Sequence, residues 1–165
     1  AIGVHGLAIL SQREGLQFSF PLVSDCAPLN GLVASMLSTD DRIHCLRDPT
    51  RGGLAATLNE LAQQSRVGMR LLEAAIPVKP EVAGACELLG LDPLNVAYEG
   101  KLICICAASD AERVLAAMHA HPLGADAAII GVVVADEHMF VQMRTVFGGQ
   151  RMVDWLTGEQ LPRIC

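Results

Sequence analysis

Residues 43–65 read IHCLRDPTRGGLAATLNELAQQS, and this stretch decides the fold class. Ile43 to Arg47 is predicted to be a short strand, and Leu54, Leu58 and Leu61 recur on one face of a predicted helix. The segment that joins them contains two adjacent glycines. A strand, a glycine-rich loop and a helix in direct succession are typical of α/β layer folds.

The same alternation continues toward the C-terminus. The sequence predicts strands at 69–72, 101–107, 128–134, 139–146 and 150–154, and helices at 80–89 and after Ser109. Gly148 and Gly149 predict a hairpin between the last two strands, and a hairpin requires antiparallel pairing. We therefore expect an α/β fold with a mixed β-sheet layered with helices.

Toward the N-terminus we expect a strand at Gly6 to Leu10, a turn at Glu14 and Gly15, and a second strand at Leu16 to Leu22. A helix should follow Pro28, with an apolar stripe that includes Leu32 and Met36. The chain opens directly in an apolar segment and has neither an initial Met nor a leader pattern. We therefore expect the C-terminal part of a longer protein.

Composition narrows the class of protein. The 165 residues are 52% hydrophobic and 18% charged, which suits one compact domain. A formal net charge of −6 argues against a nucleic-acid surface, and no apolar run reaches the roughly 20 residues that span a bilayer. Four of the six cysteines lie in apolar periodic segments, which predicts small hydrophobic residues in a reduced, cytoplasmic protein; they are Cys45, Cys86, Cys104 and Cys106.

The first candidate site is the loop 48–53. Gly52 and Gly53 let backbone N–H groups approach a ligand, the following helix start favours an anion, and Arg51 adds a bidentate donor. The acidic Asp48, two residues before Thr50, is a candidate magnesium ligand. The alternative is an ordinary turn in which Asp48 caps the helix and the glycines relieve crowding.

The second candidate site is Glu99, in the stretch NVAYEGK at 95–101. A carboxylate at the mouth of an apolar strand suits a general base, with its pKa open to tuning by burial and by Lys101. The alternative is a solvated Glu–Lys pair at a strand edge.

The third candidate site is the C-terminus. We expect an α/β domain over 1–154 and a flexible tail over 155–165 that ends in Cys165. Pro162 prevents a helix there, and the extended tail reaches about 33 Å from Trp155. Such a tail suits a carrier of a covalently bound group; the alternative is a frayed terminus with an incidental cysteine.

These stretches together resemble the HypE family of hydrogenase expression/formation proteins. The resemblance rests on DPTRGG at 48–53, NVAYEGK at 95–101, the ending PRIC at 162–165, SDCAPL at 24–29 and GVHG at 3–6. It covers the whole chain but corresponds only to the second domain of the family. The first two loops are shared in part with aminoimidazole ribonucleotide synthetases, selenophosphate synthetases and thiamine-phosphate kinases, which implies the fold of the C-terminal domain of that superfamily.

The resemblance implies a carbamoyl dehydratase that makes the cyanide ligands of nickel–iron hydrogenase. A carbamoyltransferase, HypF, would load a carboxamide on Cys165, ATP would convert it to a thiocyanate, and the HypC–HypD scaffold would receive the cyanide. It further implies Glu99 as the base, residues 48–53 at the phosphate end of the cleft, a homodimer, and ATP and Mg²⁺ held mostly by a first domain that this chain lacks. The fragment alone should therefore be inactive.

Two other functions remain open at this stage. One is another ATP-dependent enzyme of the superfamily, similar to selenophosphate synthetase or thiamine-phosphate kinase, for which Cys165 would be irrelevant. The other is a non-catalytic module that presents the tail or mediates oligomerisation. Tyr98 also departs from the family, which more often has Asn beside the base.

Overall fold

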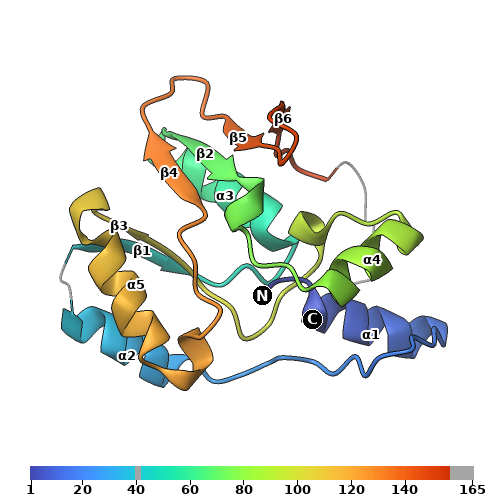
Figure 1. Ribbon diagram of the computed structural model, residues 1–165. Helices are drawn as coiled ribbons and strands as arrows, with labels where there is room; N and C mark the ends of the chain where they lie inside the picture. The colour runs from blue at the N-terminus through green and yellow to red at the C-terminus, as the bar shows by residue number, and fades with distance from the viewer. Residues whose placement is uncertain (40–41, 157–165) are drawn as a thin grey trace.

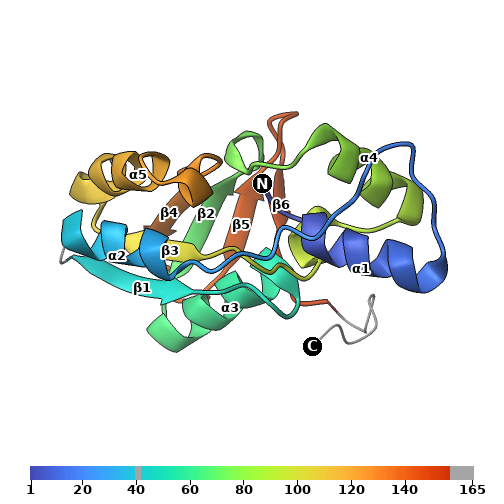
Figure 2. The ribbon, with the colours of Figure 1, turned by 90° about the horizontal axis from the view of Figure 1, so that it is seen from below.

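The structure is a computed structural model that describes residues 1–39 and 42–156. Its helices are α1 (Val4–Glu14), α2 (Asn30–Thr39), α3 (Gly53–Ser65), α4 (Pro80–Leu89) and α5 (Ala111–His119), with short 3-10 turns η1 (Glu73–Ala75), η2 (Pro93–Asn95), η3 (Ala108–Asp110) and η4 (Pro122–Gly124). Its strands are β1 (Ile43–Arg47), β2 (Gly68–Leu72), β3 (Ile103–Cys106), β4 (Gly131–Val134), β5 (Val141–Arg144) and β6 (Gln150–Met152). Helices α2 and α5 pack together at one end of the molecule, and α1 and α4 lie at the other end (Figures 1 and 2).

The strands form two sheets rather than one. A four-stranded sheet has the order β4-β2-β5-β6, in which β2 pairs parallel with β5 and antiparallel with β4, while β5 and β6 form an antiparallel hairpin. Strands β1 and β3 form a separate antiparallel pair. The predicted α/β class, the mixed pairing and the terminal hairpin are confirmed, and the division into two sheets is new.

The two predicted N-terminal strands are wrong. The first lies inside helix α1, which buries Val4, Leu7 and Ala8, and Gly15 ends this helix in a left-handed conformation instead of turning a hairpin. A short continuous apolar run fits a buried helix as well as a strand, so periodicity alone does not separate them. The second stretch has the expected period-two burial, since Phe18 and Phe20 pack against the core, but it pairs with no strand among the described residues.

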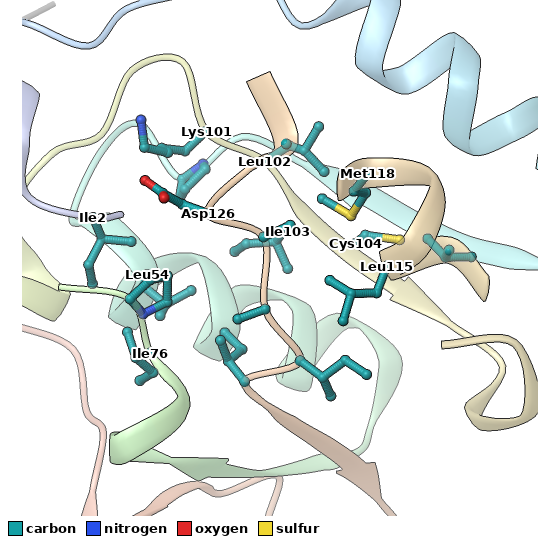
Figure 3. A pocket seen from close by; sticks show the side chains of 18 of the residues that line it. Ile2, Leu54, Ile76, Lys101, Leu102, Ile103, Cys104, Leu115, Met118 and Asp126 are labelled. Carbon is teal, nitrogen blue, oxygen red and sulfur yellow. The ribbon is translucent and has the colours of Figure 1, made fainter. Parts of the chain in front are cut away.

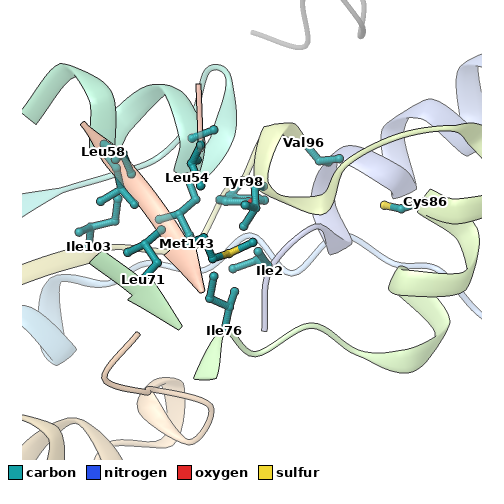
Figure 4. Close-up of a cluster of buried hydrophobic side chains, with 14 of the residues drawn as sticks. Ile2, Leu54, Leu58, Leu71, Ile76, Cys86, Val96, Tyr98, Ile103 and Met143 are labelled. Carbon is teal, nitrogen blue, oxygen red and sulfur yellow. The ribbon is translucent and has the colours of Figure 1, made fainter. Parts of the chain in front are cut away.

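Helix α3 supplies much of the main core. Leu54, Leu58 and Leu61 are buried as predicted, in one cluster with Met69 of β2 and Met143 of β5. Figure 4 shows Leu54 and Leu58 facing Leu71 and Met143 of the four-stranded sheet. A second, smaller cluster lies between α2, α5 and the β1–β3 pair; its buried members are Leu32, Met36 and Val114.

The cysteines behave as the sequence predicts. Cys86 is 1% exposed, and Cys45, Cys104 and Cys106 are partly buried against the two clusters. Cys104 and Cys106 both pack against the smaller cluster, as expected for positions two apart on one strand. Burial raises the pKa of Cys86 to about 11, and burial together with the neighbouring Cys106 raises the pKa of Cys104 to about 12.

Alkylation should separate these thiols from the exposed Cys26. The thiolate is the reactive form, and at about pH 8 a thiol with a pKa near 11 has roughly a hundredfold less thiolate than an ordinary one. We expect iodoacetamide to label Cys26 in the folded protein while Cys86 and Cys104 stay unmodified until urea is added, as measured by peptide mass spectrometry. Equal labelling of Cys26 and Cys86 without urea would contradict this burial.

Candidate functional site

The loop 48–53 and the loop 95–101 are in direct contact at the start of α3. A Cβ atom on Gly53 would lie 2.4 Å from the carbonyl oxygen of Val96 and 2.5 Å from that of Leu94. No side chain fits at these distances, and Gly53 also has a left-handed φ of 61°. The glycine therefore lets the backbone of the second loop lie against the first turn of α3.

Two further segments complete the arrangement. A Cβ on Gly6 of helix α1 would lie 2.3 Å from Cγ1 of Val96, so α1 packs closely on the other side of the second loop. A Cβ on Gly100 would lie 2.4 Å from the carbonyl oxygen of Asp25. The stretches 3–6, 24–29, 48–53 and 95–101, which are far apart in the sequence, thus converge in space.

Polar contacts join the same segments. Lys101 forms an ion pair with Asp25 and also donates a hydrogen bond to the Gly100 carbonyl. His5 Nδ1 lies 2.7 Å from the Ser24 hydroxyl oxygen. We did not predict His5, Ser24 or Asp25 as site residues. The sequence did contain a signal for them, because all three lie in the upstream stretches that carry the family resemblance.

The first loop combines features of both interpretations. Asp48 and Arg51 are exposed, and the Thr50 hydroxyl donates a hydrogen bond of 2.9 Å to the Asp48 carboxylate. Asp48 does not cap α3, because the N-cap residue is Gly52 and no side chain caps the helix. The close contact at Gly53 supports the interpretation as an ordinary turn. The helix start without a capping side chain and the exposed Arg51 support the interpretation as an anion site.

In the second loop, neighbouring side chains have different environments. Tyr98 is 2% exposed, and its hydroxyl donates a hydrogen bond to the Pro93 carbonyl. Burial raises the pKa of Tyr98 well above its usual value, against a smaller lowering by a hydrogen bond from the Leu54 backbone N–H. Glu99 is only half-buried. The predicted acceptor Cys165 lies outside the described residues.

A large apolar cavity lies beside these loops. It has a volume of about 950 Å³ and is bounded by β3 and α5 on one side and by β2, β4 and α3 on the other (Figure 3). Lys101 and Asp126 lie at one end, and a hydrogen bond from the amino group of Ala1 lowers the pKa of Asp126. Tyr98 and Lys101 line the cavity, but Asp48, Arg51 and Glu99 do not. The cavity is therefore distinct from the predicted site.

Among residues 1–39 and 42–156, no three His, Cys, Asp or Glu side chains come together in a group that could hold a metal ion. Within that same part of the chain, no helix has both the length and the apolar character needed to cross a membrane.

Substitution of Gly53 by Ala tests the contact between the two loops. We expect a loss of about 3 kcal/mol or more in the free energy of unfolding, because the methyl group meets two backbone carbonyls. Gly90→Ala is the matched control, because Gly90 has a similar φ of 66° but no atom within 4 Å of the added methyl group. We expect it to lose only about 1 kcal/mol of unfolding free energy, from the left-handed conformation alone. Urea unfolding followed by circular dichroism measures both, and equal losses would show that the loops do not press on Gly53.

Proteins of related sequence match this chain over its whole length. The family model described as "AIR synthase related protein, C-terminal domain" matches residues 1–144. The chain is 68% identical over 165 residues to the carbamoyl dehydratase HypE of Azotobacter vinelandii. The matched region covers 100% of this chain and 48% of that protein. The chain spans about half the length of the curated relatives it matches.

Solved structures agree with this result. A structure of the hydrogenase maturation protein HypE in complex with ATP superposes with a TM-score of 0.93 at 48% identity, over 100% of this chain and 50% of that one. A structure of a HypE–HypF complex matches with a TM-score of 0.90 at 44% identity, over 94% of this chain and 50% of that one. The resemblance to HypE proteins that the motifs indicated is therefore confirmed. Because the family model covers most of its length, the chain belongs to the AIR synthase related protein family, as the C-terminal domain.

Proposed function

We propose that this chain is the acceptor-bearing part of an ATP-dependent carbamoyl dehydratase of hydrogenase maturation. The reaction converts an S-carboxamide on Cys165 into a thiocyanate, which is the source of the cyanide ligands of the active-site iron. One observation carries the proposal: the Glu99 loop and the Arg51–Gly53 loop meet at the start of α3, in a chain 68% identical to a protein named carbamoyl dehydratase.

The start of α3 suits the phosphate end of an ATP site. Gly52 contributes no side chain to cap the helix, the positive end of a helix favours an anion, and Arg51 is exposed just before it. Asp48 offers one carboxylate to Mg²⁺. A nucleotide-bound Mg²⁺ usually takes one or two carboxylates together with phosphate oxygens and water, so Asp48 would supply part of the set. The other ligands would come from the half of the relatives' length that this chain does not span.

The chemistry needs a leaving group and a base. The amide oxygen of the carboxamide becomes a leaving group when it takes the γ-phosphoryl group of ATP, and ADP is released. The C–O bond then breaks with loss of phosphate, the two N–H protons are removed, and a C≡N bond remains on sulfur. Glu99 is the proposed acceptor of an N–H proton, because it is a half-buried carboxylate in the loop whose residues 94–96 lie against Gly53 of α3.

The tail and the partners complete the proposal. Cys165 carries the substrate on its own sulfur, so a segment that follows the last strand has to reach the loops. HypF is the proposed donor of the carboxamide, supported by the solved complex of a related HypE with HypF. The HypC–HypD scaffold is the proposed acceptor of the cyanide, and the working state is proposed to be a homodimer in the cytoplasm.

Intact mass spectrometry tests the acceptor. We expect the full-length protein, incubated with HypF, carbamoyl phosphate and ATP, to gain one carboxamide and then lose the mass of one water. Cys165→Ala should gain nothing, because it lacks the C-terminal sulfur that is the proposed acceptor. An unmodified Cys165 in a mixture whose HypF is active would overturn the proposal and favour another ATP-dependent reaction of the superfamily.

Glu99→Gln tests the base. We expect the carboxamide to form on Cys165 at the normal rate but its conversion to thiocyanate to slow by about a hundredfold or more, because an amide cannot accept the proton. Glu60→Gln is the matched control, since Glu60 lies on α3 and pairs with Arg47 away from the second loop. Equal conversion rates in the two variants would leave the chain as a module that presents its tail without catalysing the reaction.

A further inference from the structure

A hydrogen bond between His5 and Ser24 joins two segments that are separate in the sequence. His5 lies in the first turn of α1, Ser24 lies in the extended segment that precedes α2, and His5 Nδ1 is 2.7 Å from the Ser24 hydroxyl oxygen. The extended segment runs back past the start of α1, which brings the two side chains together (Figures 1 and 2). The bond therefore ties helix α1 to the segment around Ser24.

A second partner of Ser24 indicates the direction of this bond. The Cys26 backbone N–H donates to the Ser24 hydroxyl oxygen at 3.3 Å, so this oxygen already accepts one hydrogen bond. The hydroxyl proton is then available to Nδ1 of His5, which accepts it as a neutral imidazole with its own proton on Nε2. Both side chains are half-buried, so the bond is partly shielded from water.

Helix α1 holds the beginning of the second loop. Gly6 directly follows His5, and a Cβ atom on Gly6 would lie 2.3 Å from Cγ1 of Val96 and 2.9 Å from the carbonyl oxygen of Ala97. Packing this close leaves no space for the backbone of residues 96–97 to move toward the helix. The position of these residues therefore depends on the position of α1.

The segment that follows Ser24 holds the end of the same loop. A Cβ atom on Gly100 would lie 2.4 Å from the carbonyl oxygen of Asp25. The side chain of Asp25 also forms an ion pair with Lys101. The position of residues 100–101 therefore depends on the position of the segment around Asp25.

These contacts form a closed ring around Glu99. The ring runs from α1 through the His5–Ser24 bond to the segment around Asp25, then along residues 101–96 and back to α1. Glu99 lies in the part of the loop between the two contacts. Without the His5–Ser24 bond, the two supports of the loop could shift relative to each other, and the backbone at Glu99 would shift with them.

We infer that His5 and Ser24 are positioning residues: their hydrogen bond locks together the two supports of the loop 95–101 and so fixes the backbone that carries Glu99. The inference rests on the proposed function, in which Glu99 is the base, and it adds two residues that act through Glu99. Misplacement of a reacting group by about 1 Å can cost about a hundredfold in rate, so one hydrogen bond at this place is sufficient for such a role.

The experiment separates the hydrogen bond from the residues that form it. In the full-length protein, Ser24→Ala and His5→Phe each remove the bond, the double variant removes both partners, and Ser24→Thr keeps the hydroxyl. Ser11→Ala is the matched control, because the Ser11 hydroxyl donates a half-buried hydrogen bond of 2.8 Å to the Leu16 carbonyl at the other end of α1. The readouts are amide hydrogen exchange of residues 95–101, the KM for ATP, and the single-turnover rate of thiocyanate formation from protein already carrying the carboxamide.

A positioning role predicts that the loop and the rate change together. In Ser24→Ala the amides of residues 95–101 should exchange about threefold to tenfold faster, as expected from the loss of one hydrogen bond. Thiocyanate should form about tenfold or more slowly, with the KM for ATP changed by less than about twofold. Ser24→Thr should restore both values to near those of the wild type, and Ser11→Ala should change neither. The double variant should be no slower than the slower single variant, because both substitutions remove the same bond.

The contrary outcomes are distinct. Unchanged exchange in Ser24→Ala, faster exchange without a loss of rate, or additive losses in the double variant would each overturn the inference and leave the proposed function intact. Absence of thiocyanate with the wild-type protein would instead overturn the proposed function. If one single variant does not fold, the other carries the same test, and failure of both to fold would assign the pair to stability alone and overturn the inference.

Discussion

The structure depends on one close approach of backbone to backbone. Residues 94–97 pass between helices α1 and α3, and both helices present a glycine where any side chain would overlap with this segment. Close packing of this kind leaves little room for relaxation, so a methyl group at either glycine has to displace residues 94–97 or the helix that carries it. Helices α1 and α3 can lie this close to the second loop only because Gly6 and Gly53 have no Cβ atom.

Polar contacts orient the loops within this framework. The Lys101–Asp25 ion pair joins the second loop to the extended segment that precedes α2, and both side chains are only partly exposed. Within the same loop, the Tyr98 hydroxyl donates a hydrogen bond to the Pro93 carbonyl. Hydrogen bonds to buried groups are costly to break because the remaining partner has no access to water. These contacts fix the relative orientation of the loops more specifically than apolar burial alone would.

The large cavity and the candidate site are neighbours with different chemistry. The cavity has mostly apolar walls, and charged side chains such as Lys101 and Asp126 lie at one end (Figure 3). Just before the start of α3, Arg51 is exposed, and Glu99 in the second loop is half-buried. Residues 98–101 contribute to both, because Tyr98, Gly100 and Lys101 line the cavity while Glu99 does not. Neighbouring residues of one short segment thus have different environments.

The sequence by itself determined the elements whose signals are local. Helix α3 has a leucine stripe, α4 begins at Pro80 and ends before Gly90, and the terminal hairpin has its glycine pair, so each could be predicted from neighbouring residues. The types of residue in the two loops were likewise readable as chemistry. Only the tertiary structure decided that the run from Gly6 to Leu10 is helical, that the strands divide into two sheets, and that Asp25 rather than a nearby carboxylate pairs with Lys101. The physical reason is the same in each case: these outcomes depend on contacts between residues far apart in the chain, and local periodicity carries no information about such contacts.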